Sequence, residues 1–285
     1  MLSAIRTDLL LELLPLTAAA VLVVSGVRTS TGFVAQTLES GERYAWTRDR
    51  IATFSRETVL RALFGLLRVI GHQPPSPVAL RPAPGNNPLL LIPDPAWGPA
   101  SFTFLARFLQ ARGLSPQVVR FRPEARSLAE RADEVDAAIE AHRRATGSPQ
   151  IDLVAAGAGG VITVLCLRNL DRAARVRRMV ALGVPFRGTR MAAFRTDDGV
   201  RELRPGAIGL DALLPVSVPI LSVWSTDDPE VVPPSSAVAD SNHAVAVEGV
   251  GHLGMLLSAR TFRAVHTALT DVHFEPAAAT TGSPT

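Results

Sequence analysis

Short apolar runs that are continuous rather than alternating constrain the fold of this chain more than any other feature of its sequence. A strand with one face in water alternates apolar and polar side chains, whereas a strand buried on both faces of a parallel sheet is apolar along most of its length. Segments of helical periodicity separate the runs. Strand–helix alternation with right-handed crossovers predicts an α/β fold with a doubly wound, mostly parallel sheet. The predicted strands lie at residues 89–92, 117–121, 151–155, 176–182, 220–224 and 244–247.

The helices predicted between these strands complete one α/β domain over residues 88–273. The six prolines of residues 73–88 predict a linker, placed at 76–87, between this domain and an N-terminal segment of residues 1–75. Residues 274–285 have few bulky apolar side chains and are predicted to form a disordered tail. The helices of the main domain are expected at 101–112, 127–145, 160–169 and 258–269.

The N-terminal segment contains an apolar stretch, residues 9–27, that is long enough to cross a bilayer. Three interpretations remain open: a membrane anchor, a helix that packs on the main domain or lies in the membrane interface, and a cleaved signal peptide. The signal peptide is disfavoured because Glu12 interrupts the stretch and no small-x-small cleavage site follows it. A second helix is expected over residues 56–70, where apolar residues recur at helical spacing.

The arginines around the apolar stretch predict which side of a membrane the main domain occupies. Arg6 alone precedes the stretch, and several arginines follow it. Because cytoplasmic flanks carry the excess of positive charge, this distribution favours a membrane-associated protein with a cytoplasmic main domain. The arginines that follow are Arg28, Arg43, Arg48 and Arg50.

Composition argues against several classes of function. The 29 basic residues are all arginine, but 26 acidic residues nearly balance them, so the net charge is only +3 and nucleic acid is not an expected partner. The single cysteine, Cys166, excludes an internal disulfide and a metal site built from cysteines. The six histidines show no metal-binding spacing. No metal and no cofactor are therefore expected.

Four stretches, in order, resemble the bacterial lipase/esterase family of α/β-hydrolases. PLLLIPDPAWG at 88–98 resembles the first strand and oxyanion loop, and IDLVAAGAGG at 151–160 resembles the strand and nucleophile elbow. VALGVPFRGTRMA at 180–192 is similar to a further conserved segment of that family. WSTDDPEVVPPSSA at 224–237, followed by VEGVGHLGMLLS at 247–258, resembles the acid and histidine loops. The matches cover nearly 190 residues, and together they imply the α/β-hydrolase fold.

The resemblance implies acyl transfer, in which a serine attacks an ester, a histidine takes its proton and an acid orients the histidine. The acid corresponds to Asp228 and the histidine to His252. Gly157 stands at the position of the serine, and Ala156 stands where the family has a histidine. Glycine offers no side-chain nucleophile, but it adopts the positive φ of an elbow without strain. The triad is therefore expected to be a remnant.

The oxyanion positions of the resemblance are Pro93, Asp94 and Ala158. Pro93-Asp94 replaces the usual His-Gly pair, so one position has no N–H to donate and the next carries a negative charge that would oppose an oxyanion. Phe186 also stands where the family has a histidine. Several separate losses favour a pseudoenzyme with a binding or scaffolding role at a membrane. Its expected partners are a lipid or acyl ligand, the membrane itself and a protein. The alternative is an atypical, serine-independent acyl-ester hydrolase that uses His252 and Asp228.

Overall fold

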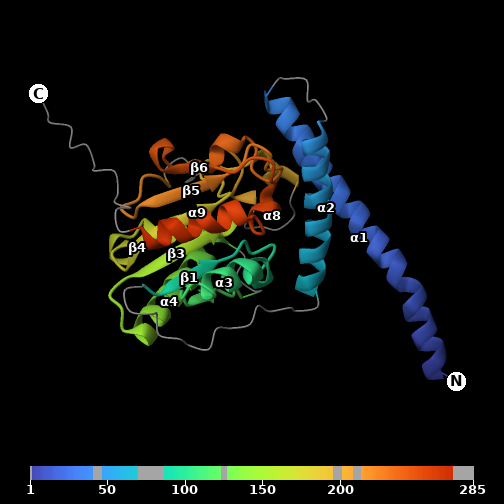
Figure 1. Cartoon of the computed structure of the whole chain (residues 1–285), viewed down its shortest axis with the longest axis horizontal. Coiled ribbons are helices and arrows are strands. Elements are labelled where there is room, and N and C mark those ends of the chain that lie inside the picture. Colours follow the sequence, from blue (N-terminus) through green and yellow to red (C-terminus); the bar gives the residue numbers. More distant parts are fainter. Residues whose placement is uncertain are drawn as a thin grey trace, which may run out of the picture.

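The computed structural model describes residues 2–40, 47–69, 87–122, 127–194, 201–207 and 213–271, but not the side chains of residues 2–16, 40, 68 and 69. Within these residues six parallel strands form one sheet in the order β2-β1-β3-β4-β5-β6. The predicted α/β fold with a doubly wound sheet is confirmed (Figure 1). The strands are β1 Leu89–Ile92, β2 Pro116–Val118, β3 Ile151–Ala156, β4 Val176–Leu182, β5 Ile220–Trp224 and β6 Ala244–Ala246.

The central strands are buried on both faces, as their continuous apolar sequences predict. In β1, Leu90 and Ile92 pack into the core on one face of the sheet, and Leu89 and Leu91 pack into the core on the other. Because successive strand side chains point to opposite faces, an apolar run is what a two-sided core requires. Strand β2 ends three residues earlier than predicted, since it is the edge strand and pairs with β1 only from Pro116 to Val118.

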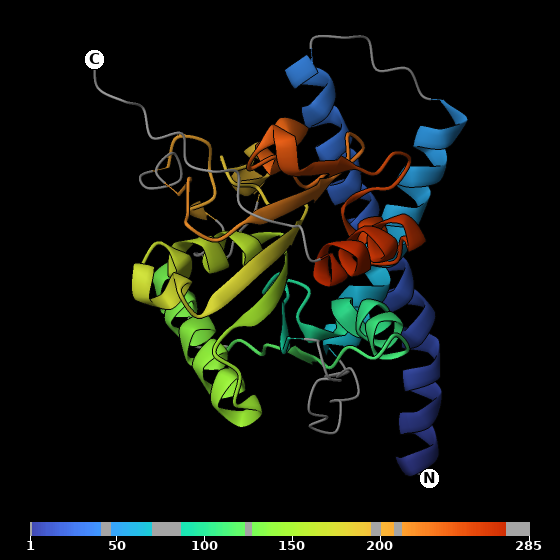
Figure 2. The ribbon, with the colours of Figure 1, turned by 60° about the vertical axis from the view of Figure 1, so that its left-hand side comes forward.

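Helices cover both faces of the sheet (Figure 2). Helices α4 and α5 contribute to the first core, and α3 and α9 to the second. Helix α4 begins where expected, because Ser127 and Glu130 form a capping box at its start. Helix α5 begins two residues earlier than predicted, directly after the elbow. The helices of the main domain are α3 Thr103–Gln110, α4 Leu128–Thr146, α5 Ala158–Leu167, α6 Leu170–Ala173, α8 His252–Met255 and α9 Ala259–Thr270, with short 3-10 turns η1 Pro99–Phe102, η2 Arg190–Phe194, η3 Pro234–Ala237 and η4 Ser241–His243.

The N-terminal segment forms two helices, α1 Leu2–Ser40 and α2 Arg48–Val69, which lie against one side of the α/β domain (Figures 1 and 2). Helix α2 begins eight residues before the predicted start, and its Leu60 and Phe64 join the second core of the domain. Phe33 of α1 is also buried. Packing on the domain therefore involves α2 and the C-terminal part of α1, which lie beyond the apolar stretch at residues 9–27.

The N-terminal half of α1 extends away from the domain (Figure 1). Every described side chain from residue 17 to 24 is exposed. Over Thr17–Glu39 the helix is long and apolar enough to cross a bilayer, or to serve as a signal sequence, and 22% of its most apolar window is buried. Apart from residue 87, the predicted linker lies outside the described residues, and so does the whole predicted tail.

Candidate active site

The structure brings the predicted acid and base into direct contact. Asp228 lies in the loop after β5, and His252 begins α8, which follows β6. The Nδ1 atom of His252 lies 2.8 Å from Oδ2 of Asp228, and both side chains are buried. The other carboxylate oxygen, Oδ1 of Asp228, accepts the backbone N–H groups of Glu230 at 2.8 Å and Val231 at 3.1 Å. Both oxygens of the acid are thus occupied, which holds the imidazole in one orientation.

Gly157 lies in the turn between β3 and α5, the place that the motif predicted. Its φ of 53° is positive, as expected for an elbow. A Cβ atom at this position would lie 2.5 Å from Oδ2 of Asp94, closer than real Cβ contacts come. Any side chain at residue 157 would therefore meet both backbone strain and the Asp94 carboxylate.

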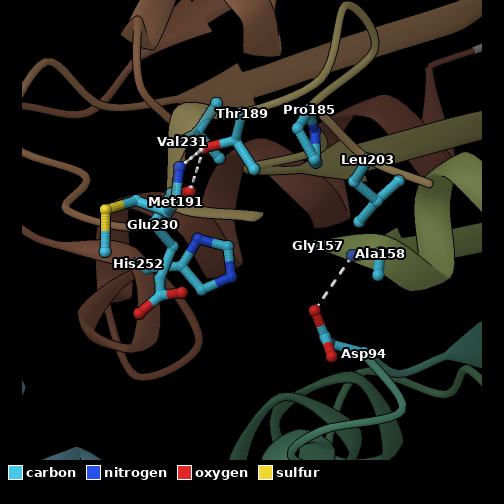
Figure 3. A pocket seen from close by; sticks show the side chains of 10 residues that line it. All are labelled: Asp94, Gly157, Ala158, Pro185, Thr189, Met191, Leu203, Glu230, Val231 and His252. Atoms are coloured by element: carbon cyan, nitrogen blue, oxygen red, sulfur yellow. Dashed lines mark hydrogen bonds between the residues drawn. The ribbon is translucent and has the colours of Figure 1, made fainter. Parts of the chain in front are cut away.

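The Asp94 carboxylate lies directly in front of the elbow (Figure 3). Its Oδ2 accepts the backbone N–H of Ala158 at 3.0 Å, and its Oδ1 accepts the N–H of Ala96 at 2.7 Å. The side chain is 5% exposed. The backbone of Pro93 lies against the start of α5, since a Cβ at Gly159 would come within 2.3 Å of the Pro93 carbonyl oxygen. The amide of Ala158, one of the predicted oxyanion positions, thus already binds an anionic oxygen of the chain itself.

His252 carries an altered charge state in this environment. Burial lowers the pKa of its imidazole, but the negative charge and hydrogen bond of Asp228, together with the charges of Glu230 and Asp94, outweigh burial and raise the pKa to about 9. These neighbours therefore favour the positively charged form of the imidazole. A protonated imidazole donates hydrogen bonds from both nitrogens and cannot accept a proton.

The pocket between these groups is small. The His252 ring faces Gly157 and Asp94 across it (Figure 3). The volume open to water-sized molecules is ≈ 20 Å³, which is room for about one water molecule. Phe186, the third predicted departure from the family, is 1% exposed and belongs to the core. The described residues that line the pocket are Asp94, Gly157, Ala158, Pro185, Thr189, Met191, Leu203, Glu230, Val231 and His252.

Sequence reasoning missed the residues that the N-terminal helices contribute behind this site. Glu57 and Arg61 are buried on the same face of α2 as Leu60 and Phe64. Arg61 forms an ion pair with Glu230, and Glu57 accepts backbone N–H groups of the histidine loop. The sequence does contain a signal for these residues: Glu57 and Arg61, four residues apart, are charged residues on the apolar face of the predicted second helix.

The sequence matches no protein-family model. It also matches no curated protein. Among solved structures, the mature lipase of Bacillus licheniformis is similar with a TM-score of 0.57 and 15% identity, over 67% of this chain and 94% of that one. Lipase B of Aspergillus fumigatus is similar with a TM-score of 0.54 and 22% identity, over 70% of this chain and 56% of that one. At these identities the likeness establishes the fold, which is that of α/β-hydrolase lipases and esterases.

Proposed function

We propose that this chain is a catalytically inactive, lipase/esterase-like protein of the α/β-hydrolase fold, with a binding or scaffolding role at a bacterial membrane. One observation carries the proposal: the carboxylate of Asp94 accepts the Ala158 N–H and stands where a side chain at Gly157 would project. The groups that would have to attack an acyl carbon and stabilise its oxyanion are thus absent or engaged by the chain itself.

The energetic consequence for acyl transfer is large. Loss of one oxyanion donor alone lowers the rate by about 10²–10³. Here the Ala158 donor is engaged by a full negative charge, and a developing oxyanion would have to approach that charge in a site where it is little screened. Gly157 adds the loss of the nucleophile itself. Restoring a serine without moving Asp94 would therefore leave the transition state without its stabilising groups.

The charge state of His252 supports the same conclusion. A general base has to be neutral at the working pH, whereas the raised pKa of this imidazole favours its protonated form. Asp94, Asp228 and Glu230 all lie close enough to stabilise that positive charge. We infer that the His252–Asp228 pair stabilises the two loops that carry it, as a buried ion pair.

The test is whether the full-length chain turns over esters. Purified in detergent, it should hydrolyse short-chain p-nitrophenyl esters no faster than a His252→Ala variant, and it should not react with a fluorophosphonate probe, which labels activated serines. Labelling of any serine, or turnover that His252→Ala abolishes, would overturn the proposal.

A second candidate is an atypical, serine-independent acyl-ester hydrolase in which His252 activates water. The 2.8 Å contact between His252 and Asp228 favours it, because this is the geometry of a general base and its orienting acid. The two candidates differ in their pH profile. A water-activating His252 would produce ester turnover that rises with pH as the imidazole loses its proton near pH 9.

The membrane part of the proposal rests on α1. Its described side chains at residues 17–24 are exposed, and those from Val21 to Val24 are all apolar. Burying such a surface in a bilayer is favourable by roughly 25 cal/mol per Å². We propose that the stretch at residues 9–27 anchors the chain, with the main domain in the cytoplasm and with a lipid, an acyl ligand or a protein as the bound partner. The intact chain should sediment with membranes after a carbonate wash, and deletion of residues 1–30 should release it.

A further inference from the structure

The two N-terminal helices hold the two loops that carry the acid and the base. On α1, Gly32 lies against the acid loop so closely that a Cβ atom there would come within 2.1 Å of the Pro229 carbonyl oxygen. Gln36, one turn further along α1, donates a hydrogen bond of 2.5 Å from Nε2 to the carbonyl oxygen of Asp228. The acid loop therefore rests on α1 at the two residues Asp228 and Pro229.

The histidine loop rests in the same way on α2. Thr53 donates its hydroxyl to the carbonyl oxygen of Gly249 at 3.2 Å, and Arg56 donates to the same oxygen. Glu57, next along the helix, is 0% exposed. Its two carboxylate oxygens accept the backbone N–H of Leu253 at 2.9 Å and that of Gly254 at 2.6 Å. These two amides belong to the residues that directly follow His252.

The packing at Glu57 leaves no room for a side chain at the two nearest glycines of the histidine loop. A Cβ atom at Gly251 would lie 2.3 Å from Cγ of Glu57, and one at Gly254 would lie 2.9 Å from Oε1. Gly251 and Gly254 therefore let the carboxylate approach the loop backbone closely, and Glu57 joins Thr53 and Arg56 in holding the loop against the helix.

The charged groups around Glu57 make its ionisation sensitive to the site. Burial, together with the charge of Asp228, raises the pKa of Glu57 to about 7, although the hydrogen bonds from Leu253 and Gly254 and the charge of His252 lower it. On α2 itself, Arg56 lies at the rim, close to Gly254, and Arg61 is paired with Glu230 of the acid loop. The negative charge of Glu57 and the positive charge of His252, the first residue of α8, therefore stabilise each other.

We propose that Glu57 is a positioning residue for His252. Through Glu57, the α1–α2 helix pair holds the histidine loop in place and stabilises the positive charge of the imidazole beside Asp228. Helix α1 supplies the matching hold on the acid loop through Gln36. Helix α1 therefore carries both the proposed membrane stretch and a contact to the acid loop. This inference concerns the site of the proposed function, but it rests on contacts of the folded chain and not on the loss of catalysis.

The test is a titration of the His252 imidazole by NMR in the full-length chain in detergent micelles, with its resonance assigned from a His252→Asn sample. Glu57→Gln keeps the size of the side chain and removes its charge. It should lower the pKa of His252 by about one pH unit, because a nearby negative charge favours the imidazolium. Glu39→Gln is the matched control: Glu39 lies on α1 and pairs with Arg190 at 2.6 Å. It should leave the pKa of His252 unchanged.

A second measurement covers the case in which Glu57→Gln does not fold. Glu57→Asp keeps the charge but shortens the reach to the two amides, so hydrogen exchange at Leu253 and Gly254 should accelerate by about tenfold, as expected for the loss of one hydrogen bond. An unchanged exchange rate at these amides, an unchanged pKa of His252 in Glu57→Gln, or an equal shift in the Glu39→Gln control would each overturn the proposal. Neither readout involves ester turnover, so failure here is distinct from failure of the proposed function.

Discussion

The two walls of the pocket differ in the groups that they offer for acyl transfer. On the wall formed by β1, β3 and α5, the nucleophile position is Gly157 and the oxyanion amide of Ala158 is engaged by Asp94. On the wall formed by the loops after β5 and β6, the predicted acid and base, Asp228 and His252, lie 2.8 Å apart and buried. We infer that this buried pair contributes to the stability of the two loops that carry it, whereas the other wall has no comparable ion pair among its described residues.

The largest change in stability is expected from a substitution in the wall that carries Asp228 and His252. Asp228→Ala leaves the His252 imidazolium buried without its main partner and leaves the Glu230 and Val231 amides without an acceptor. Breaking a buried ion pair from one side costs about 3–5 kcal/mol of the free energy of unfolding. Urea denaturation of the variant and of the wild type measures this. Asp133→Asn, whose side chain is 72% exposed, is the control and should change the free energy by less than about 0.5 kcal/mol.

The pH dependence of the free energy of unfolding is a second test of the wall that carries Asp228 and His252. The pKa of His252 in the folded chain is about 9, above its ordinary value of 6.5, so its contribution to stability is fully present below pH 6.5 and is lost as the pH rises through 9. The pKa of Glu57 is raised from 4.5 to about 7, so its contribution is fully present below pH 4.5 and is lost as the pH rises through 7. Both raised pKa values make the free energy of unfolding fall as the pH rises. The free energy of unfolding should fall by up to about 3 kcal/mol between pH 6.5 and 9, and His252→Asn should remove most of that slope.

Gly157→Ser tests the wall formed by β1, β3 and α5. The serine would enter a positive-φ conformation at a cost of about 1–3 kcal/mol, and its Cβ would also meet Asp94. Gly206→Ser is the matched control, because Gly206 has a φ of 73° with nothing within 4 Å of a new Cβ. The difference between the two thermal melts isolates the contact with Asp94. A loss at Gly157 no greater than the loss at Gly206 would mean that Asp94 moves aside freely.

The same variant also tests the oxyanion argument. Gly157→Ser alone should show no esterase activity, whereas Pro93→His, Asp94→Gly and Gly157→Ser together should show more. Turnover of a p-nitrophenyl ester measures both. If the single variant proves as active as the triple one, Gly157 is the only lesion and Asp94 does not block the site.

The smallest expected effect belongs to Asp94→Asn. The carboxamide has one acceptor oxygen, so either Ala96 or Ala158 loses its partner, at a cost of about 1–2 kcal/mol. The pKa of His252 should also fall, because Asp94 is one of the charges that raise it. A thermal melt and a titration of the imidazole measure the two effects. A stabilised variant would show that Asp94 is strained where it stands.

Some features of the site followed from local sequence. The order of the motifs placed Gly157, Asp228 and His252 after the carboxyl ends of three parallel strands, β3, β5 and β6, and those ends share one edge of the sheet. Their convergence, the positive φ of Gly157 and the buried strands were therefore predictable, since each depends on a few neighbouring residues or on the apolar pattern of one run. The apolar stretch at residues 9–27 likewise predicted a helix but left its surroundings open.

Other features were decided only by tertiary structure. The sequence predicted that the negative charge of Asp94 would oppose an oxyanion. Only the tertiary structure showed that its carboxylate accepts the N–H of Ala158, 64 residues away along the chain. Glu57 meets the histidine loop across a separation of 196 residues. No local pattern specifies such a contact, because a buried carboxylate is stable only where backbone amides from a distant segment are folded against it.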